Sequence, residues 1–201
     1  MNNLLLIAAL AMMSVSIAAC NNSNKSAAST TKDTASTPSN SPAVQPSTDK
    51  AGVDAKTAAS EKAIVEGYLQ LKNALTKDNS NDAATAGKAL ADDFGKLDKS
   101  VLTADQKKSF EDIADDAKEM AEHIGKSAGN LPHQREHFDM LSRDMVDLVK
   151  LLGAGQPLFV DHCPMYNHSK GADWLSETRD IRNPYLGTKM PTCGSVKEEL
   201  K

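Results

Sequence analysis

The chain has 201 residues, of which 40% are hydrophobic and 25% charged, so it is long enough for one ordinary domain with appendages. The net charge is −4 and Lys and Arg form no cluster, which argues against nucleic acid as a partner, because its binders concentrate positive charge on one face. Aromatic residues make up only 4% of the chain, less than a β-sandwich or a carbohydrate-binding surface usually carries, and this favours helices.

The N-terminus has the form of a lipoprotein export signal. An apolar run after Asn3 is followed by small residues, and the stretch from Ile17 to Cys20 matches a lipoprotein cleavage box. The run is too short for a membrane-spanning helix, which needs about 20 apolar residues. We therefore predict a signal peptide over residues 1–19 and a lipidated Cys20 that holds the protein in the bacterial cell envelope, facing the periplasm or the cell surface. A simple secreted protein is the alternative.

The segment after the cleavage box cannot form a core. Between Asn21 and Lys50 it consists mainly of Ser, Thr, Asn, Pro and Ala, and Val44 is its only sizeable aliphatic residue. Such a composition buries too little apolar surface to offset the entropy of ordering the chain. Residues 20–56 are therefore predicted to be a disordered tether, and the folded domain is predicted over residues 57–201.

Apolar residues then recur at intervals of three and four, which is the period of an amphipathic helix. A first helix is predicted from about Thr57, a second after Asn81, a third from Thr103 and a fourth after Asn130. The predicted core positions are Ile64, Tyr68, Leu71 and Leu75, then Ala83, Ala86, Leu90, Phe94 and Leu97, then Phe110, Ile113, Ala117, Met120 and Ile124, and finally Phe138, Leu141, Met145, Leu148 and Leu152. Short polar turns between the helices predict an all-α domain, an up-down-up-down four-helix bundle.

Local signals mark several helix ends. Thr103, with Gln106 three residues later, fits a capping box at the start of the third helix. Pro132 lies in the first turn of the fourth helix, which ends at Gly153. Gly87 in the second helix is expected to allow close approach to a neighbour.

Residues 154–201 differ in kind, because Pro, Gly and Asn interrupt them and they hold both cysteines that follow Cys20. A short strand is predicted at Leu158-Phe159-Val160. The rest is expected to be an irregular, loop-rich segment packed on one end of the bundle, with at most a small hairpin as regular structure.

Two short stretches of this segment offer soft sulfur ligands. His162, Cys163 and Met165 lie within four positions, and Met190 and Cys193 repeat the sulfur pair in reverse order. Cys163 and Met165 point to the same side of an extended backbone, and Met190 and Cys193 converge in a turn. The two stretches, facing each other, would form a Cys2Met2 cage with His162 as a fifth candidate ligand. Such soft donors select Cu(I) or Ag(I).

Other interpretations of the same residues stay open. Exported proteins form disulfides, so Cys163 and Cys193 could instead be bridged, which would close a loop of about 30 residues and stabilise the fold by about 3 to 4 kcal/mol. Met165 and Met190 would then only fill the core. A pair that switches between bridge and metal site with the redox state is a third alternative.

The remaining candidates are weaker. His133 and His137 lie one helical turn apart, with His123 on the preceding helix, a spacing that can hold a metal but is more often a solvated face. His168 lies in a polar turn and is expected to be exposed. No phosphate loop, nucleophile elbow or HExxH motif is present, and neither cysteine has the sequence context of a thiol enzyme, so we expect no enzymatic activity.

Several motifs between residues 60 and 200 carry a family resemblance. They are Tyr68-Leu69-x-Leu71-Lys72-x-Ala74-Leu75, Gln134-Arg135-Glu136-His137-Phe138-x-x-Leu141-Ser142, His162-Cys163-Pro164-Met165, Gly171-Ala172-Asp173-Trp174-Leu175-Ser176, Ile181-Arg182-Asn183-Pro184-Tyr185 and Met190-x-x-Cys193-Gly194. The chain thereby resembles a bacterial domain of unknown function that occurs as exported lipoproteins and fused to periplasmic adaptor subunits of copper and silver efflux systems.

Together with the lipoprotein signal and the sulfur ligands, the resemblance favours a membrane-tethered protein that binds Cu(I) for copper handling or relay to efflux, with an efflux adaptor or another copper-handling protein as partner. The alternative is a disulfide-stapled helical interaction module that docks on such an adaptor, or on another envelope protein, without metal. Trp174 would shield a Cu(I) site by a cation–π contact or simply anchor a loop, and Asn183-Pro184-Tyr185 is expected to be a turn with a buried ring.

Overall fold

The computed structural model describes residues 55–200. The predicted signal peptide, Cys20 and all of the predicted tether except residues 55 and 56 lie outside the described residues. The elements are α1 (Ala55–Thr76), α2 (Ser80–Phe94), η1 (Lys99–Val101), α3 (Ala104–Lys126), α4 (Leu131–Leu152), β1 (Leu158–Cys163), α5 (Tyr166–Ser169), β2 (Ala172–Ser176), η2 (Gly187–Lys189) and β3 (Ser195–Leu200). Among the described residues no helix is long and apolar enough to cross a membrane.

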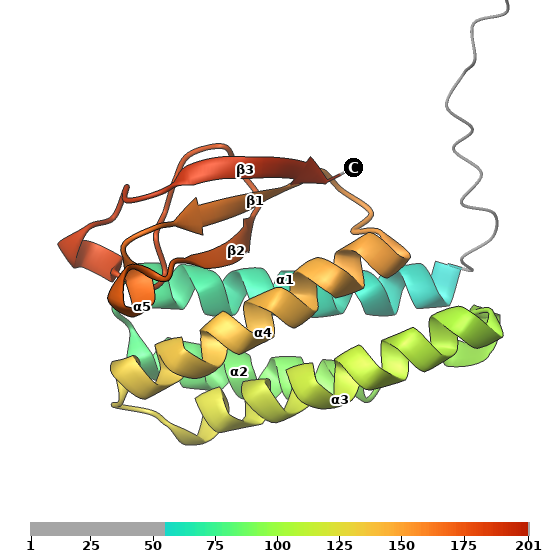
Figure 1. Cartoon of the computed structure of the whole chain (residues 1–201). Coiled ribbons are helices and arrows are strands. Elements are labelled where there is room, and N and C mark those ends of the chain that lie inside the picture. The colour runs from blue at the N-terminus through green and yellow to red at the C-terminus, as the bar shows by residue number, and fades with distance from the viewer. Residues whose placement is uncertain (1–54, 201) are drawn as a thin grey trace, which may run out of the picture. The chain divides into compact units, whose positions relative to one another are not determined.

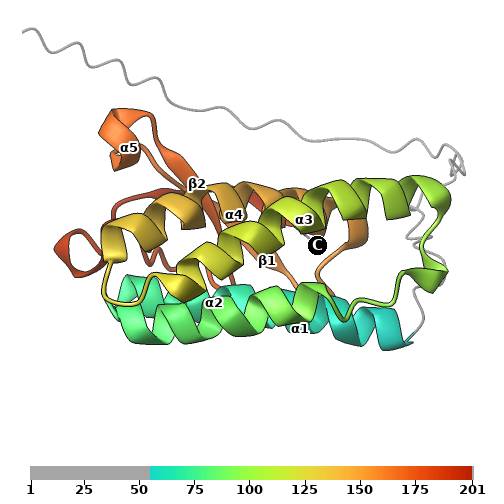
Figure 2. The same cartoon turned by 90° about the horizontal axis from the view of Figure 1, so that it is seen from below.

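The four long helices and the small sheet are arranged in three layers. The helices α1 and α4 form the middle layer, with α2 and α3 on one side of it and the three strands on the other (Figure 1). Seen from the side opposite the sheet, α2 and α3 lie in front (Figure 2). The domain is mostly helical, as expected, but the all-α prediction is wrong in the C-terminal part, which forms a three-stranded sheet.

The predicted apolar stripes are largely the observed core. All four positions of α1 are buried, and so are all five of α4, including Phe138 and Met145. In α3 the buried face is displaced, because Ala114 and Ala121 lie in the core whereas Ile113 and Met120 are only partly buried. Small residues on this face let α2 and α3 approach closely.

The close approach takes place at two glycines. A Cβ atom on Gly87 would lie 2.8 Å from the carbonyl oxygen of Ala121, and one on Gly125 would lie 2.7 Å from the Lys88 side chain. Only glycine fits at such a crossing without displacing backbone. The prediction that Gly87 allows a neighbouring helix to approach is confirmed.

The helix caps follow the sequence signals with one shift. Thr103 and Gln106 form the predicted capping box, and α4 ends at Gly153, as predicted. The helix α2 begins at Ser80 rather than after Asn81, because the Asn79 side chain accepts a hydrogen bond from the backbone N–H of Asp82.

The C-terminal segment is more ordered than the predicted irregular loops with at most a hairpin. It forms a three-stranded antiparallel sheet in the order β2-β1-β3, and the predicted short strand extends from Leu158 to Cys163. The edge strand β3 is mostly exposed and is held by ion pairs from three of its residues. These pairs are Lys197 with Asp173, Glu198 with Lys150 and Glu199 with Arg179.

Candidate metal centre

The fold brings together the two cysteines that lie 30 residues apart in the sequence. Cys163 is the last residue of β1, and Cys193 lies in the loop between η2 and β3. Their Sγ atoms are 3.5 Å apart, both thiols are free, Cys163 is buried and Cys193 is partly exposed. The pair is thus reachable from solvent on the Cys193 side only.

Asn183 holds the Cys193 loop in place. Its side chain is fully buried; Nδ2 donates to the carbonyl oxygen of Cys193 at 2.6 Å, and Oδ1 accepts from the backbone N–H groups of Tyr185 and Leu186, both at 2.8 Å. Its own backbone N–H donates to the carbonyl oxygen of Pro191 at 2.9 Å. One asparagine therefore ties both ends of this loop.

Gly194 lets the loop lie directly on the sheet. Its φ is +145°, and a Cβ atom there would be 2.8 Å from the carbonyl oxygen of His162 and 3.0 Å from the indole of Trp174. The preceding turn is closed by the N–H of Cys193, which donates to the carbonyl oxygen of Met190 at 3.2 Å. The predicted turn from Met190 to Cys193 is confirmed.

The same loop is anchored on the helices through Arg135 of α4. The guanidinium donates to the carbonyl oxygens of Pro184 and Leu75, at 2.8 and 3.0 Å, and pairs with Asp78, which also accepts hydrogen bonds from Thr188. Burial alone would raise the pKa of Asp78, but hydrogen bonds from Thr188 and Arg135 hold it below its usual value. The Cys193 loop is thereby fixed to the α1–α2 turn and to α4.

The surroundings of Cys193 favour its protonated thiol over the thiolate. Burial raises the pKa of the Cys193 thiol, and the neighbouring Cys163 thiol raises it further. A protonated thiol is a poor nucleophile. A metal ion can replace the protons, because thiolates are strong ligands for soft cations.

The two predicted thioether ligands lie near the surface. Met165 is 54% and Met190 45% exposed, in contrast to buried Cys163. The expectation of an extended backbone through Met165 is wrong, because β1 ends at Cys163 and Met165 adopts φ −88° and ψ −20°. The connection that follows turns through Asn167 with a left-handed φ of 51°. The four sulfur atoms therefore do not form an enclosed cage among the described residues.

The predicted fifth ligand, His162, is directed away from the thiol pair. Successive residues of a strand point to opposite faces of a sheet, so His162 and its neighbour Cys163 diverge. The His162 Nδ1 lies 2.6 Å from the carboxylate of Asp173, its cross-strand partner, which also binds Lys197 at 2.9 Å. The structure does not bring His162 to the cysteines.

Trp174 is a packed residue beneath the Cys193 loop. It is fully buried, its ring meets Tyr185 edge-on at 5.9 Å, and its Nε1 has no hydrogen-bond partner within residues 55–200. Tyr185 is itself buried, so the predicted turn with a buried ring is confirmed. The indole is close enough to Gly194 to report changes around Cys193.

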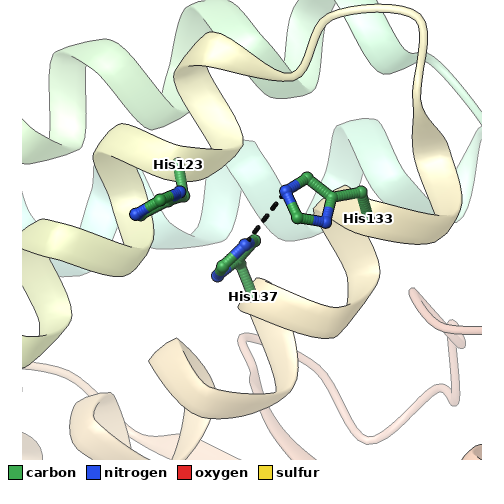
Figure 3. Close-up of side chains that lie close together, drawn as sticks. All are labelled: His123, His133 and His137. Carbon is green, nitrogen blue, oxygen red and sulfur yellow. Dashed lines mark hydrogen bonds between the residues drawn. The ribbon is translucent and has the colours of Figure 1, made fainter.

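A second cluster of ligand-type residues lies on the helices. His123 at the end of α3 meets His133 and His137 at the start of α4, and all three rings gather in one place (Figure 3). The sequence alone favours a solvated face here. The available signal was the four-residue spacing of His133 and His137 combined with a short α3–α4 connection, which folds the last turn of α3 against the first turns of α4.

Part of the chain is similar to a known protein family. Residues 64–156 match the family described as "Protein of unknown function (DUF3347)". The matched region runs from α1 past the end of α4, so it includes the three histidines but neither Cys163 nor Cys193. No curated protein and no solved structure matches the chain.

Proposed function

We propose that this protein is a lipid-anchored envelope protein that binds a soft metal ion, Cu(I) or Ag(I), through Cys163 and Cys193. It serves copper handling or the relay of copper to an efflux system, and it catalyses no reaction. The observation that supports this proposal is the 3.5 Å separation of two free thiols from distant parts of the chain.

This separation suits two ligands of one ion. Two thiolates bound to a tetrahedral ion with bonds of 2.3 Å lie about 3.8 Å apart, so a small rotation of either side chain brings the two sulfur atoms to this distance. Copper in the envelope has to be exchanged between proteins, and the partly exposed Cys193 gives it a route. Met165 and Met190, on surface loops, would approach the ion only when it is bound.

The scaffold fits such a role. In this proposal the four long helices form an up-down-up-down bundle that supports the sheet, while the ligands lie on its C-terminal loops. The predicted lipid on Cys20 would keep the site near the membrane, where an efflux adaptor or another copper-handling protein can reach it. Loops on a rigid scaffold carry function because they remain accessible.

The direct test is an anaerobic Cu(I) titration of the full chain in detergent, against a chromophoric chelator. Wild type is expected to bind one ion, Cys163→Ser to bind at least about 100-fold more weakly, and Met190→Leu to show a smaller loss. Fluorescence of Trp174 provides a second readout. Equal affinity of wild type and Cys163→Ser would refute the site.

Counting thiols distinguishes the Cu(I) proposal from its competitor, a disulfide-stapled interaction module without metal. The exported protein, denatured without reductant, is expected to contain two free thiols besides the lipid-modified Cys20. None would mean that Cys163 and Cys193 are bridged, and a mixture would point to a redox switch.

The Cys163→Ser, Cys193→Ser double variant connects binding to function in the cell. It is expected to retain its helical circular dichroism, to lose Cu(I) binding and to lower copper tolerance of the parent cell. Loss of folding would favour the disulfide interpretation instead. If the double variant folds and copper tolerance is unchanged, the interaction module would be the remaining interpretation.

A further inference from the structure

Three histidines from two helices gather away from the cysteine pair. His123 lies in the last turns of α3, and His133 and His137 lie in the first two turns of α4. The connection between the helices is only four residues long, from Ser127 to Asn130, so these ends are held side by side. Each ring offers one nitrogen atom to the cluster, and these atoms all lie within 4.8 Å of one another.

The tightest contact joins His133 and His137. Their Nε2 atoms are 3.2 Å apart, and Figure 3 shows this contact as a dashed line. Two imidazole nitrogens bound to one tetrahedral ion at 2.0 to 2.1 Å lie about 3.3 Å apart. The two nitrogens therefore already have the spacing of two ligands of one metal ion.

The surroundings assign the nitrogen that each of these two rings presents. The Nδ1 of His137 lies 3.3 Å from the thioether sulfur of Met120, which can only accept, so Nδ1 carries the proton and Nε2 is left with its lone pair. In His133 it is Nδ1 that faces the Glu136 carboxylate, at 3.6 Å, so its Nε2 points into the cluster. Ligating histidines characteristically have such outer partners.

His123 completes the set. Its ring stacks on that of His137 with centroids 4.6 Å apart, and its side chain is 45% exposed, so it can turn toward a shared ion without disturbing the core. The side chain of His133 is similarly exposed, at 42%. The cluster is thus open to solvent, which leaves a coordination position for water or for an exchanging ligand.

Two carboxylates flank the cluster. The nearby carboxylates of Glu119 and Glu136 lie 3.6 Å from His123 and His133, at the edge of the cluster rather than between the rings. In the metal-free protein the Nε2–H of His133 donates to the lone pair of His137 Nε2, and a bound metal ion would displace this proton.

We propose that His123, His133 and His137 form a second metal site, which takes a divalent transition ion and prefers Cu²⁺ to Zn²⁺. Imidazole ligands suit both ions, and Cu²⁺ binds most tightly of the first-row divalent ions. The site is independent of the proposed Cu(I) centre, since its ligands come from other elements and are harder than thiolates. The protein would then hold copper in either oxidation state, each at its own site.

The test uses the full chain in detergent with both Cys163 and Cys193 replaced by Ser, so that the thiol centre cannot contribute. Titration with Cu²⁺, followed by electron paramagnetic resonance, is expected to show one bound ion with hyperfine splitting from several nitrogens. His137→Gln and His133→Gln are each expected to weaken binding at least about 100-fold, and Met120→Leu about 10-fold.

The matched control is His168→Asn. His168 lies outside the cluster at a left-handed φ of 55°, which Asn tolerates, and this variant is expected to bind Cu²⁺ like its parent. The His133 side chain is 42% exposed, so we expect His133→Gln to remain folded, and a loss of Cu²⁺ binding in this variant would report the loss of a ligand. Unchanged affinity in His133→Gln, or an equal loss in His168→Asn, would overturn the proposal while leaving the cysteine centre untouched.

Discussion

Asn183 is the residue on which the geometry of the thiol pair depends. Its buried side chain makes three hydrogen bonds to backbone groups, one of them to the carbonyl oxygen of Cys193. A buried backbone group left without a partner costs about 1 to 3 kcal/mol, more than a typical hydrogen bond contributes. The position of Cys193 is therefore set by this residue rather than by apolar packing alone.

We expect Asn183→Ala to lower the free energy of unfolding by at least about 2 kcal/mol and to weaken Cu(I) binding, because three backbone groups lose their partner. Urea denaturation and the chelator competition measure the two effects. Asn73→Ala, which removes an exposed amide bonded to Glu177, is the control and is expected to change stability by less than about 0.5 kcal/mol. Equal effects of the two changes would contradict the assigned role.

At this scale the sequence predicted candidate ligands by residue type but not the directions of their side chains. Cys163 and Cys193 are candidates by residue type, and the turn between Met190 and Cys193 follows from their spacing. His162 and Cys163 are neighbours within β1, so the alternation of the strand directs their side chains to opposite faces. The prediction for Met165 is wrong for a different reason, because β1 ends two residues before it.

The helices differ in how much of their packing depends on single residues. At the α2–α3 crossing, Gly87 and Gly125 bring the backbones together, and no larger residue fits there. Gly95, by contrast, lies at the end of α2 with φ −72°, and a Cβ atom there would only touch the carbonyl oxygen of Asp92 at 3.4 Å.

We expect Gly87→Ala to destabilise the protein by about 1 to 3 kcal/mol, because its methyl group would collide with the backbone of α3. Alanine is the better helix former by about 1 kcal/mol, so a destabilisation shows that the collision dominates. Gly95→Ala should be neutral or stabilising by up to about 1 kcal/mol. Urea midpoints measure both, and a Gly87→Ala variant as stable as Gly95→Ala would contradict the close crossing.

Asp144 of α4 gives the stability an unusual pH dependence. Burial raises its pKa to about 6, Asp116 and Asp147 raise it further, and Arg143 opposes them. In the unfolded chain the pKa is near 3.8, so between these values the folded protein binds more protons. The contribution of this residue to the unfolding free energy therefore falls as the pH rises from about 4 to about 6.

We expect Asp144→Asn to raise the free energy of unfolding at pH 7 by about 1 kcal/mol, a value reduced from the full pKa shift because the carboxyl group is half-exposed and screened. The gain should disappear near pH 4, where Asp144 is protonated in the folded protein. Urea denaturation at the two pH values measures the difference. A destabilised variant at pH 7 would mean that the Arg143 attraction outweighs burial.

The elements were predicted with unequal success, for a physical reason. The four helices carry a strong three- and four-residue period, and Thr103 and Gly153 mark boundaries that the structure reproduces. The strand β3 carries no such signal, because Lys197, Glu198 and Glu199 lie on an exposed edge. Charged residues protect a sheet edge from pairing with other chains. The same charges remove the alternation of apolar and polar residues by which a strand is recognised in a sequence.

At the scale of the whole molecule, Arg135 connects the helical layers to the candidate metal centre. It reaches from α4 to the carbonyl oxygen of Leu75 at the end of α1, to Asp78 in the α1–α2 turn and to the carbonyl oxygen of Pro184, next to Asn183. The sequence could not predict this connection, because its partners lie 49 to 60 residues away. Gly187 completes it, since a side chain there would overlap Asp78 and Arg135.

Arg135→Lys tests whether the contacts of Arg135 hold the Cys193 loop in place on the helices. Lysine keeps the charge but lacks the planar fork that satisfies three partners at once, so we expect a loss of about 2 kcal/mol in unfolding free energy. Cu(I) affinity should fall as well, because the Pro184 and Thr188 segments lose their anchor on the helices. The Cys163→Ser, Cys193→Ser variant removes the ligands and leaves this anchor in place, so its apo stability should stay close to that of wild type. Arg135→Lys could instead lower the free energy of unfolding and leave Cu(I) affinity unchanged. That result would mean that Asn183 alone holds the Cys193 loop and that Arg135 does not affect the metal centre.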